Sequence, residues 1–451
     1  MTIRNDPEER FRRMTTEPVS RLIPALALPT IASMLVTALY NMADTYYVGR
    51  IDTSATAAVG IVFPLMSFIQ MVGMTFGVGA GSPVSRLLGR KEVDQASRTV
   101  STAFFTAAAC GALITVFGEL FLDPLMRAMG STETILPYAR EYGRFILLGA
   151  PFMAASFVMN VCLRSEGSAV LGMIGITTGA VINIVLDPIF MFTLGMGIKG
   201  AAIATVLSQL ISFAILLSHY LMRRSALRLV PANFTLEPEM HREILKSGMP
   251  TFFRQGVASL AAVMLNAAAG GYGDTAIAGM TIVTRIMLFM SSVLIGFGQG
   301  FQPVAAFNYT AGRRDRVLRA FWFSVKVGTA GLLVFAATAW TFAPAFVRLF
   351  RDDPEVVRIG AFTLRAQCIT MPLTAFIVMS NMMFQYIGQP WRASLLALSR
   401  QGLAFMPALL LLSRIFGLPG IQASQAVADL ATFLLALPIT AVTLGAMKQG
   451  V

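Results

Sequence analysis

The chain has 451 residues, of which 56% are hydrophobic and only 13% are charged, with a mean hydropathy of +0.69. A soluble globular protein carries about 25% charged residues, so this composition excludes a water-soluble fold as well as a disordered, collagen-like or coiled-coil chain. Three cysteines are too few for a disulfide-stapled scaffold, and the net charge of +12 has to be explained by where the basic residues lie.

Twelve apolar stretches are each long enough to cross a membrane. A bilayer core of about 30 Å needs about 20 apolar residues in a helix, and long runs without strict alternation indicate helices rather than barrel strands. In chain order the predicted spans are 21–47, 54–82, 97–121, 141–163, 167–193, 198–222, 247–270, 276–308, 320–346, 359–387, 393–416 and 419–446. The polar tail before residue 21 is unlike a signal peptide, so we expect the first span to be retained.

Lys and Arg side chains concentrate on one side of this predicted topology. The N-terminal tail and the loops after even-numbered spans carry most of them, with clusters at 86–91, 223–228 and 313–319. The positive-inside rule then places both termini in the cytoplasm. We expect a multi-pass protein of a prokaryotic inner (plasma) membrane. The excess positive charge reflects topology and contact with anionic lipid, and we expect no nucleic-acid partner.

The second half of the chain repeats the first. A shift of 221 residues aligns Pro29 with Pro250 and Gly79 with Gly300 without a gap, and 15 of these 51 positions are identical. Because six is an even number, both halves start on the same side of the membrane, as in parallel-repeat transporters. We therefore predict an all-α integral membrane protein in which twelve transmembrane helices form two six-helix lobes, residues 1–222 and 247–451, joined by a linker at 223–246. Two such lobes suit alternating access.

Acidic residues inside three of the spans indicate a functional site. A charge at the bilayer centre costs about 2.5–3.5 kcal/mol, so each acid needs a partner or a purpose. In the first span Tyr40 and Asn41 lie four and three residues before Asp44, on the same helix face. Asp429, in the twelfth span, is a possible additional site residue whose role the sequence leaves open.

The fifth span carries the pattern that most resembles an ion site. Asn183 and Asp187 share one helix face at a spacing of four, and Pro188 lacks the N–H that would otherwise bond the carbonyl of Ile184, which makes that carbonyl a candidate cation ligand. If Asp44 meets Asp187 in a shielded chamber, a bound proton or cation relieves the repulsion between the two carboxylates. The sequence favours H+, with Na+ at Asp44, Asn183 and Asp187 as the alternative.

This candidate site is confined to the first half. The positions equivalent to Asp44, Asn183 and Asp187 are Leu265, Ala404 and Ala408. Basic residues lie inside spans of the second half instead, at Arg254, Arg285 and Arg365.

Three stretches resemble one known family. They are PTIASMLVTALYNMADTYYVGR from Pro29, NVCLRSEG from Asn160 and NIVLDP from Asn183, and in this order and spacing they resemble the MATE (multidrug and toxic compound extrusion) family over essentially the whole chain. The resemblance implies a secondary antiporter that exports amphipathic organic cations in exchange for inward H+ or Na+. It also implies no cofactor beyond that ion, amphipathic small molecules and membrane lipids as partners, and a monomer.

Within this family the chain best resembles the DinF-like branch, in which the first lobe holds the coupling ion. The residues that the resemblance assigns to the site are Asp44, Tyr40, Asn160, Asn183, Asp187 and Thr205, and Pro29 corresponds to the proline at which the first helix bends. Pro188 is the second proline at which we expect a helix to bend. The helix-7 acid of the NorM-like branch is missing, since no acid lies between Glu243 and Asp274.

The polar residues inside the spans raise two alternatives to transport of this kind. A flippase for a lipid-linked saccharide would need a cationic cavity, to which Arg254, Arg285 and Arg365 are the candidate contributors. An intramembrane aspartyl protease would need YD and GxGD motifs, but Asp44 follows Ala43 and Asp187 follows Leu186. Because no hydrolase or nucleotide-binding motif occurs either, we expect the protein not to be an enzyme.

Overall fold

The computed structural model describes residues 7–48, 50–51 and 53–449, and within them every side chain except those of residues 7, 41, 45, 53–56 and 274. These residues fold into helices, and no strand occurs among them. Twelve of the helices are long and apolar enough to cross a membrane, which confirms the twelve predicted spans. The chain is therefore a multi-pass membrane protein.

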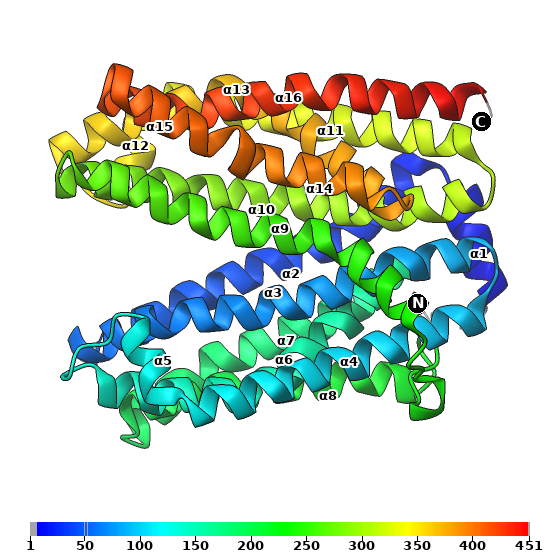
Figure 1. Cartoon of the computed structure of the whole chain (residues 1–451), viewed down its shortest axis with the longest axis horizontal. Coiled ribbons are helices and arrows are strands. Elements are labelled where there is room, and N and C mark those ends of the chain that lie inside the picture. The colour runs from blue at the N-terminus through cyan, green and yellow to red at the C-terminus, as the bar shows by residue number, and fades with distance from the viewer. Residues whose placement is uncertain (1–6, 49, 52, 450–451) are drawn as a thin grey trace. The chain divides into compact units, whose positions relative to one another are not determined.

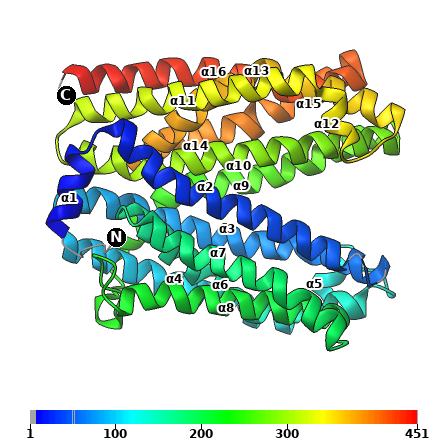
Figure 2. The ribbon, with the colours of Figure 1, turned by 180° about the vertical axis from the view of Figure 1, so that it is seen from behind.

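The first half of the chain forms six of these membrane-spanning helices with short connecting elements (Figure 1). In order they are α1 (Pro7–Thr16), α2 (Val19–Val48), α3 (Thr53–Gly89), α4 (Val93–Leu120), α5 (Leu122–Ala128), α6 (Leu136–Ser165), α7 (Ala169–Pro188), the π-helix η1 (Ile189–Thr193), α8 (Gly197–Leu221) and the short helix η2 (Pro231–Asn233). Figure 2 shows α7 and α8 beside each other, in agreement with their packing.

The second half repeats this order. Its elements are α9 (Pro238–Gly270), α10 (Asp274–Thr310), α11 (Arg314–Thr341), α12 (Ala343–Arg348), α13 (Pro354–Tyr386), α14 (Pro390–Leu398), the π-helix η3 (Ser399–Leu403), α15 (Phe405–Phe416) and α16 (Leu418–Gln449). Local chemistry sets the helix ends. For example, Asp353 accepts hydrogen bonds from the backbone N–H groups of Glu355 and Val356 at the start of α13, and satisfies donors that the first turn leaves unpaired.

The helices pack into two compact units that differ from the predicted lobes in two short segments. Unit 1 comprises the residues up to Met14 together with Leu28–Gly248, and unit 2 comprises Thr15–Ala27 and Met249–Val451. Residues 15–27 therefore belong with the second half, and residues 238–248, predicted mainly as linker, form the start of α9 and belong with the first half. The chain changes unit inside α2 and inside α9, at positions 221 residues apart.

Two equivalent glycines explain why these segments change unit. A Cβ on Gly79 of α3 would lie 2.3 Å from the carbonyl oxygen of Ile244, and a Cβ on Gly300 of α10 would lie 2.6 Å from the backbone nitrogen of Ala27. Only glycine allows backbones to approach this closely. The start of α9 thus packs on α3 in unit 1, and the start of α2 packs on α10 in unit 2.

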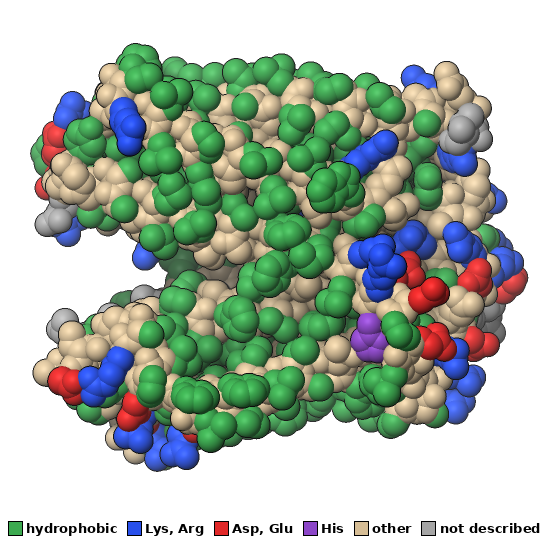
Figure 3. Space-filling model, viewed as in Figure 1, with side chains coloured by type: hydrophobic (Ala, Val, Ile, Leu, Met, Phe, Trp, Pro, Cys, Tyr) green, Lys and Arg blue, Asp and Glu red, His purple; other side chains and the backbone are tan. Residues whose placement is uncertain are grey.

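Each unit is built around one central helix. The apolar window of α6 is 72% buried in unit 1 and that of its repeat equivalent α13 is 56% buried in unit 2, more than in any other candidate span. On the face seen in Figure 3, hydrophobic side chains cover most of the middle of the helices, whereas most Lys, Arg, Asp and Glu side chains gather near the helix ends. This distribution matches a hydrocarbon core between two polar surfaces.

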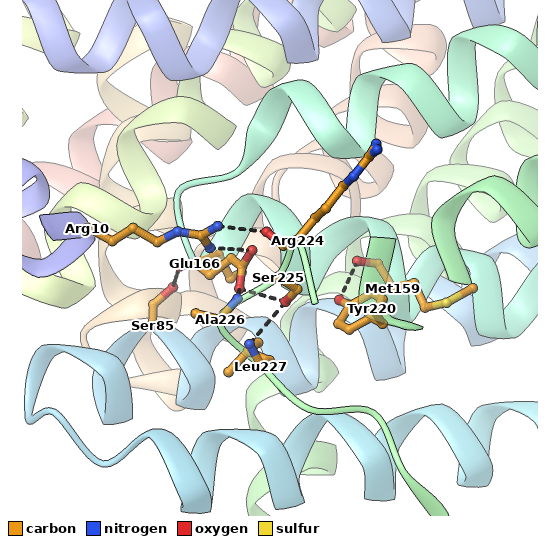
Figure 4. Close-up of polar contacts among 10 residues, drawn as sticks. Arg10, Ser85, Met159, Glu166, Tyr220, Arg224, Ser225, Ala226 and Leu227 are labelled. Atoms are coloured by element: carbon orange, nitrogen blue, oxygen red, sulfur yellow. Dashed lines mark hydrogen bonds and ion pairs between the residues drawn. The ribbon is translucent and has the colours of Figure 1, made fainter. Parts of the chain in front are cut away.

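A buried carboxylate at the end of α6 fixes both α1 and the segment after α8 within unit 1 (Figure 4). Glu166 forms an ion pair of 2.7 Å with Arg10 and accepts hydrogen bonds from the Ser225 hydroxyl (2.8 Å) and the Ala226 N–H (2.9 Å). Arg10 also donates to the carbonyl of Arg224 at 2.8 Å. One acid thereby holds two chain segments that are far apart in sequence.

Candidate coupling site

The centre of the candidate site lies between α7 and α8 in unit 1. The amide nitrogen of Asn183 donates to Asp187 Oδ1 at 3.3 Å and lies 3.4 Å from the Thr205 hydroxyl. All three side chains are buried, and Asp187 has no exposed surface. The spacing of four between Asn183 and Asp187 produces this contact within α7, and α8 supplies Thr205.

Helix α2 brings the second carboxylate to the same place. The charges of Asp44 and Asp187 interact with each other, and both act on the buried side chain of Tyr40. The structure therefore gathers Asp44, Tyr40, Asn183, Asp187 and Thr205 in unit 1. The side chain of Asn41, the other polar residue predicted on this face of α2, lies outside the described residues.

Three oxygen atoms of this group are buried without a hydrogen-bond donor among the described residues. They are Asp44 Oδ1, Asp187 Oδ2 and Asn183 Oδ1. A buried acceptor without a donor costs about 1–3 kcal/mol, and more when it is charged. A proton or a small cation would remove that cost by bonding to these oxygens. No group of three or more His, Cys, Asp or Glu side chains able to hold a metal occurs in the described part of the chain.

A cavity of about 70 Å³ adjoins these side chains. Tyr40, Asn183 and Thr205 line one part of it, and further polar side chains from α3, α6 and α8 line the rest: Gln70, Ser156, Ser208, Gln209 and Ser212. By this measure a water molecule needs about 10–15 Å³, so the cavity has room for several.

Tyr142 of α6 was not predicted and belongs to the same surroundings. It is fully buried, its hydroxyl donates to the sulfur of Met66 at 4.0 Å, and the charges of Asp44 and Asp187 act on it. A tyrosine in an apolar span is a weak signal by itself, and no spacing within α6 links it to the acids on α2 and α7.

Asn160, which the family resemblance assigns to the site, bonds to the backbone of the next helix. Its amide nitrogen donates to the carbonyl of Gly172 at 3.0 Å, and at the equivalent place in unit 2 Asn381 donates to the carbonyl of Ala393 at 2.6 Å. Both halves use this bond to join two successive helices. The bond of Asn160 is thus a feature of the repeat. It is separate from the hydrogen bonds that join Asn183 to Asp187 and Thr205.

The two predicted helix-bending prolines lie at changes in helix geometry or packing. Helix α2 passes from unit 2 to unit 1 between Ala27 and Leu28, and Pro29 is the next residue after Leu28. Pro188 ends α7, and the π-helix η1 follows it. A π-helix inside or beside an α-helix is frequent at functional sites.

Asp429 has a partner that the sequence analysis missed. Arg400, on the π-helix η3, donates from Nε to Asp429 Oδ1 at 2.8 Å, and Gln425 donates to the same oxygen at 3.0 Å. Arg400, like Arg254, lies inside a span, but 29 residues separate it from Asp429, so no helical spacing predicts the pair. Asp429 is therefore neutralised within unit 2.

The three predicted intramembrane arginines of the second half have different surroundings. Arg365 donates to the carbonyl of Trp340 at 3.1 Å, Arg285 is exposed, and Arg254 is partly buried. These surroundings lend no support to a shared pyrophosphate cavity.

The twelve spans, the two repeated halves and a polar site inside one half define a membrane transporter built from a parallel repeat. The family profile named MatE matches residues 29–189 and again 250–410, so the chain belongs to the MATE family. The two matches are offset by the same 221 residues as the sequence repeat. Members of this family are transporters, and the chain is not an enzyme.

Individual relatives agree with this assignment. The multidrug export protein MepA of Staphylococcus aureus (strain MSSA476) is 28% identical over 428 residues, covering 94% of this chain and 93% of that protein. MepA of Staphylococcus haemolyticus (strain JCSC1435) is 27% identical, covering 91% of each chain. A crystal structure of MATE in the bent conformation matches with a TM-score of 0.92 at 26% identity over 98% of both chains. The outward-facing conformation of a multidrug resistance MATE transporter gives 0.90 at 26%, again over 98% of both.

Proposed function

We propose that this protein is a secondary antiporter that exports amphipathic organic cations in exchange for inward H+ or Na+. The observation that carries the proposal is the set of three buried oxygens, Asp44 Oδ1, Asp187 Oδ2 and Asn183 Oδ1, that lack a donor among the described residues. The relatives named as multidrug export proteins support the substrate class. The concentration of Lys and Arg on one face supports cytoplasmic termini in a prokaryotic inner membrane.

The coupling follows from the charge of the site. With no cation bound, Asp44 and Asp187 repel each other in surroundings of low dielectric. A proton or Na+ arriving from outside bonds to both and favours the conformation in which they approach. Because a ligand shifts an equilibrium only by its differential affinity, the ion must bind one conformation more tightly than the other. Asp44 lies on α2, the helix that belongs to both units, so its movement relative to Asp187 is linked to the position of Pro29.

The energy available is sufficient for export. When two ions enter for each monovalent organic cation exported, one net elementary charge moves inward, which across about 100 mV supplies about 2.3 kcal/mol and corresponds to roughly 50-fold accumulation of the exported compound. A one-for-one exchange moves no net charge and draws on the concentration gradient of the ion alone. No nucleotide site is needed.

Drug efflux and ion counterflow in proteoliposomes test the proposal. Asp44→Asn and Asp187→Asn each remove a carboxylate and keep its size, so we expect each to abolish ion-driven efflux. Asp315→Asn is the matched control, because Asp315 is an exposed acid outside the site. If both site variants transport as the unsubstituted protein does under an imposed gradient, the proposal is wrong.

The choice between H+ and Na+ needs a separate measurement. Two carboxylates with one amide favour H+, whereas ligation by Asp, Asn and Thr oxygens together favours Na+. We expect efflux to persist when Na+ is removed at a fixed pH gradient. Loss of efflux under that condition would assign the site to Na+.

A further inference from the structure

Three buried serines beside the coupling site have hydroxyls that bond to nothing in the described part of the chain. They are Ser156 on α6 and Ser208 and Ser212 on α8, each only 3% exposed. A serine in a helix usually bonds to the carbonyl four residues earlier, as Ser97 and Ser259 do here. These three hydroxyls do not, and all three line the cavity of about 70 Å³ described above.

The serines extend the coupling site in one direction. On α8, Ser208 and Ser212 follow Thr205 by three and seven residues, on the same face. On α7 the cavity lining runs from Asn183 back to Ile176. At 1.5 Å per residue this covers about 10 Å, from the coupling site towards the start of α7 and the end of α8, which is the proposed cytoplasmic side.

Gly179 allows α7 to pack closely against α8 beside this cavity. A Cβ at position 179 would lie 2.8 Å from Ser212 Cβ and 3.0 Å from the carbonyl oxygen of Ser208. Any side chain at position 179 would displace α8 together with both serines, so the spacing of α7 and α8 at this point depends on glycine.

Unit 2 lacks the equivalent feature. The positions that correspond to Ser156 and Ser208 are the buried apolar residues Ile377 and Ala428. The position that corresponds to Ser212 is Thr432, whose hydroxyl bonds to its own helix at the carbonyl of Ala428, 2.8 Å away. Position 400, equivalent to Gly179, carries the arginine that pairs with Asp429. The open hydroxyls therefore occur in the half that holds the candidate ion site.

We propose that Ser156, Ser208 and Ser212 hold a chain of water molecules that conducts the coupling ion between Asn183 and the cytoplasmic end of α7. Each hydroxyl can donate to and accept from water, and the cavity carries several hydroxyl and amide groups on its lining and is large enough to retain several molecules. A proton would pass along the hydroxyls and waters, and Na+ would keep part of its hydration shell there. The inference rests on the proposed antiport, since it supplies the exit of the ion after its release from Asp187.

Substitution of the serines tests conduction. We expect Ser208→Ala/Ser212→Ala to slow drug-driven ion release severalfold in proteoliposomes while the effect of the ion on drug affinity at equilibrium stays unchanged. Ser218→Ala is the matched control on the same helix, because the Ser218 hydroxyl already bonds to the carbonyl of Ile215. Gly179→Ala should slow ion release in the same way. A normal rate in the double variant would overturn the proposal. Equal loss of ion binding and ion release would also overturn it, since the serines would then be ligands of the ion site.

Thiol labelling tests the water directly and does not depend on antiport. With Cys110, Cys162 and Cys368 replaced by Ala, Ser212→Cys should react with a small water-soluble methanethiosulfonate much faster than Ser324→Cys. Ser324 is a suitable control because it is fully buried with an unpartnered hydroxyl, yet does not line this cavity. Only a hydrated thiol forms the reactive thiolate readily. Equally slow labelling at both positions would show a dry cavity and contradict the proposal. If labelling is fast but the unsubstituted protein shows no ion effect on drug affinity, the proposed antiport fails and the hydrated cavity stands.

Discussion

A carboxylate inside a membrane-spanning helix is tolerated either because a fixed partner neutralises it or because its charge is used, and this chain contains both cases. Asp429 is held by Arg400 and Gln425. Asp187, by contrast, receives one long hydrogen bond from Asn183 and keeps Oδ2 without a donor in the described chain. The same residue type therefore has a structural role in unit 2 and a proposed coupling role in unit 1.

A double-substitution cycle distinguishes the structural acid. Removing one partner of a buried pair costs about 3–5 kcal/mol, and we expect less here because Arg400 is 27% exposed. Asp429→Leu and Arg400→Met should each lower the thermal midpoint in detergent, whereas the double variant should recover most of the loss. If the two losses simply add in the double variant, the pair is not a coupled ion pair. Ion-driven transport by the double variant should persist.

The spacing of residues along one helix predicts contacts within that helix. Asn183 and Asp187 meet because they are four residues apart on α7. The contact of Tyr142 with Met66 and the pairing of Arg400 with Asp429 each depend on the rotation of two separate helices, which no local pattern specifies. The three serines were missed for the same reason, since their open hydroxyls are visible only once α6 and α8 are packed.

Helices in this chain approach one another through glycine at specific positions. Gly79 contacts the backbone of Ile244, and a backbone atom cannot move aside as a side chain end can. The length of the apolar runs predicted all twelve spans. Because residues 238–246 are polar, the sequence predicts them as linker, whereas in the structure α9 begins at Pro238. Their position is set by packing on α3 instead of by contact with lipid.

Substitution of Gly79 measures that packing. Gly79→Ala places a Cβ 2.3 Å from the Ile244 carbonyl oxygen, and we expect overpacking to cost about 1–3 kcal/mol. Gly331→Ala in α11 is the control: nothing lies within 4 Å of its added Cβ, and alanine stabilises an exposed helical position by about 0.5–1 kcal/mol. The two variants should therefore shift the thermal midpoint in opposite directions. A rise for both would mean that α9 does not depend on this contact.

Glu166 forms the buried ion pair that attaches α1 to the end of α6. Glu166→Gln removes the charge that attracts Arg10 and keeps acceptor capacity for Ala226. We expect α1 to detach more often, which should accelerate trypsin cleavage at Arg12 and Arg13 in the detergent-solubilised protein. Lys91→Ala is the control, since the exposed pair of Lys91 with Glu8 is worth only about 0.2–1 kcal/mol. Cleavage at the unsubstituted rate in Glu166→Gln would show that other contacts hold α1.

The repeat explains the architecture, and its departures from symmetry locate the function. Asn160 and Asn381 make the same bond in both halves, as do the glycine contacts at positions 79 and 300. The two acids of the site have no polar equivalents, since Asp44 and Asp187 correspond to Leu265 and Ala408. Aligning the halves thus predicted both the fold and the half that carries the site. It could not predict that each half contributes a helix segment to the other unit, because sequence similarity says nothing about which copy a segment packs on.

That exchange of segments determines how the chain can be divided. Unit 1 includes residues 238–248, so a fragment that ends at residue 230 lacks the segment that covers Gly79, whereas a fragment that ends at residue 248 contains it. We expect fragment 1–248 to be extracted from membranes with a higher thermal midpoint than fragment 1–230. Co-expression of fragments 1–230 and 231–451 should restore transport, because the two together supply residues 15–27 to unit 2 and residues 238–248 to unit 1. Equal midpoints for the two single fragments would mean that unit 1 is complete without the start of α9, and the predicted boundary at residue 222 would then describe it better.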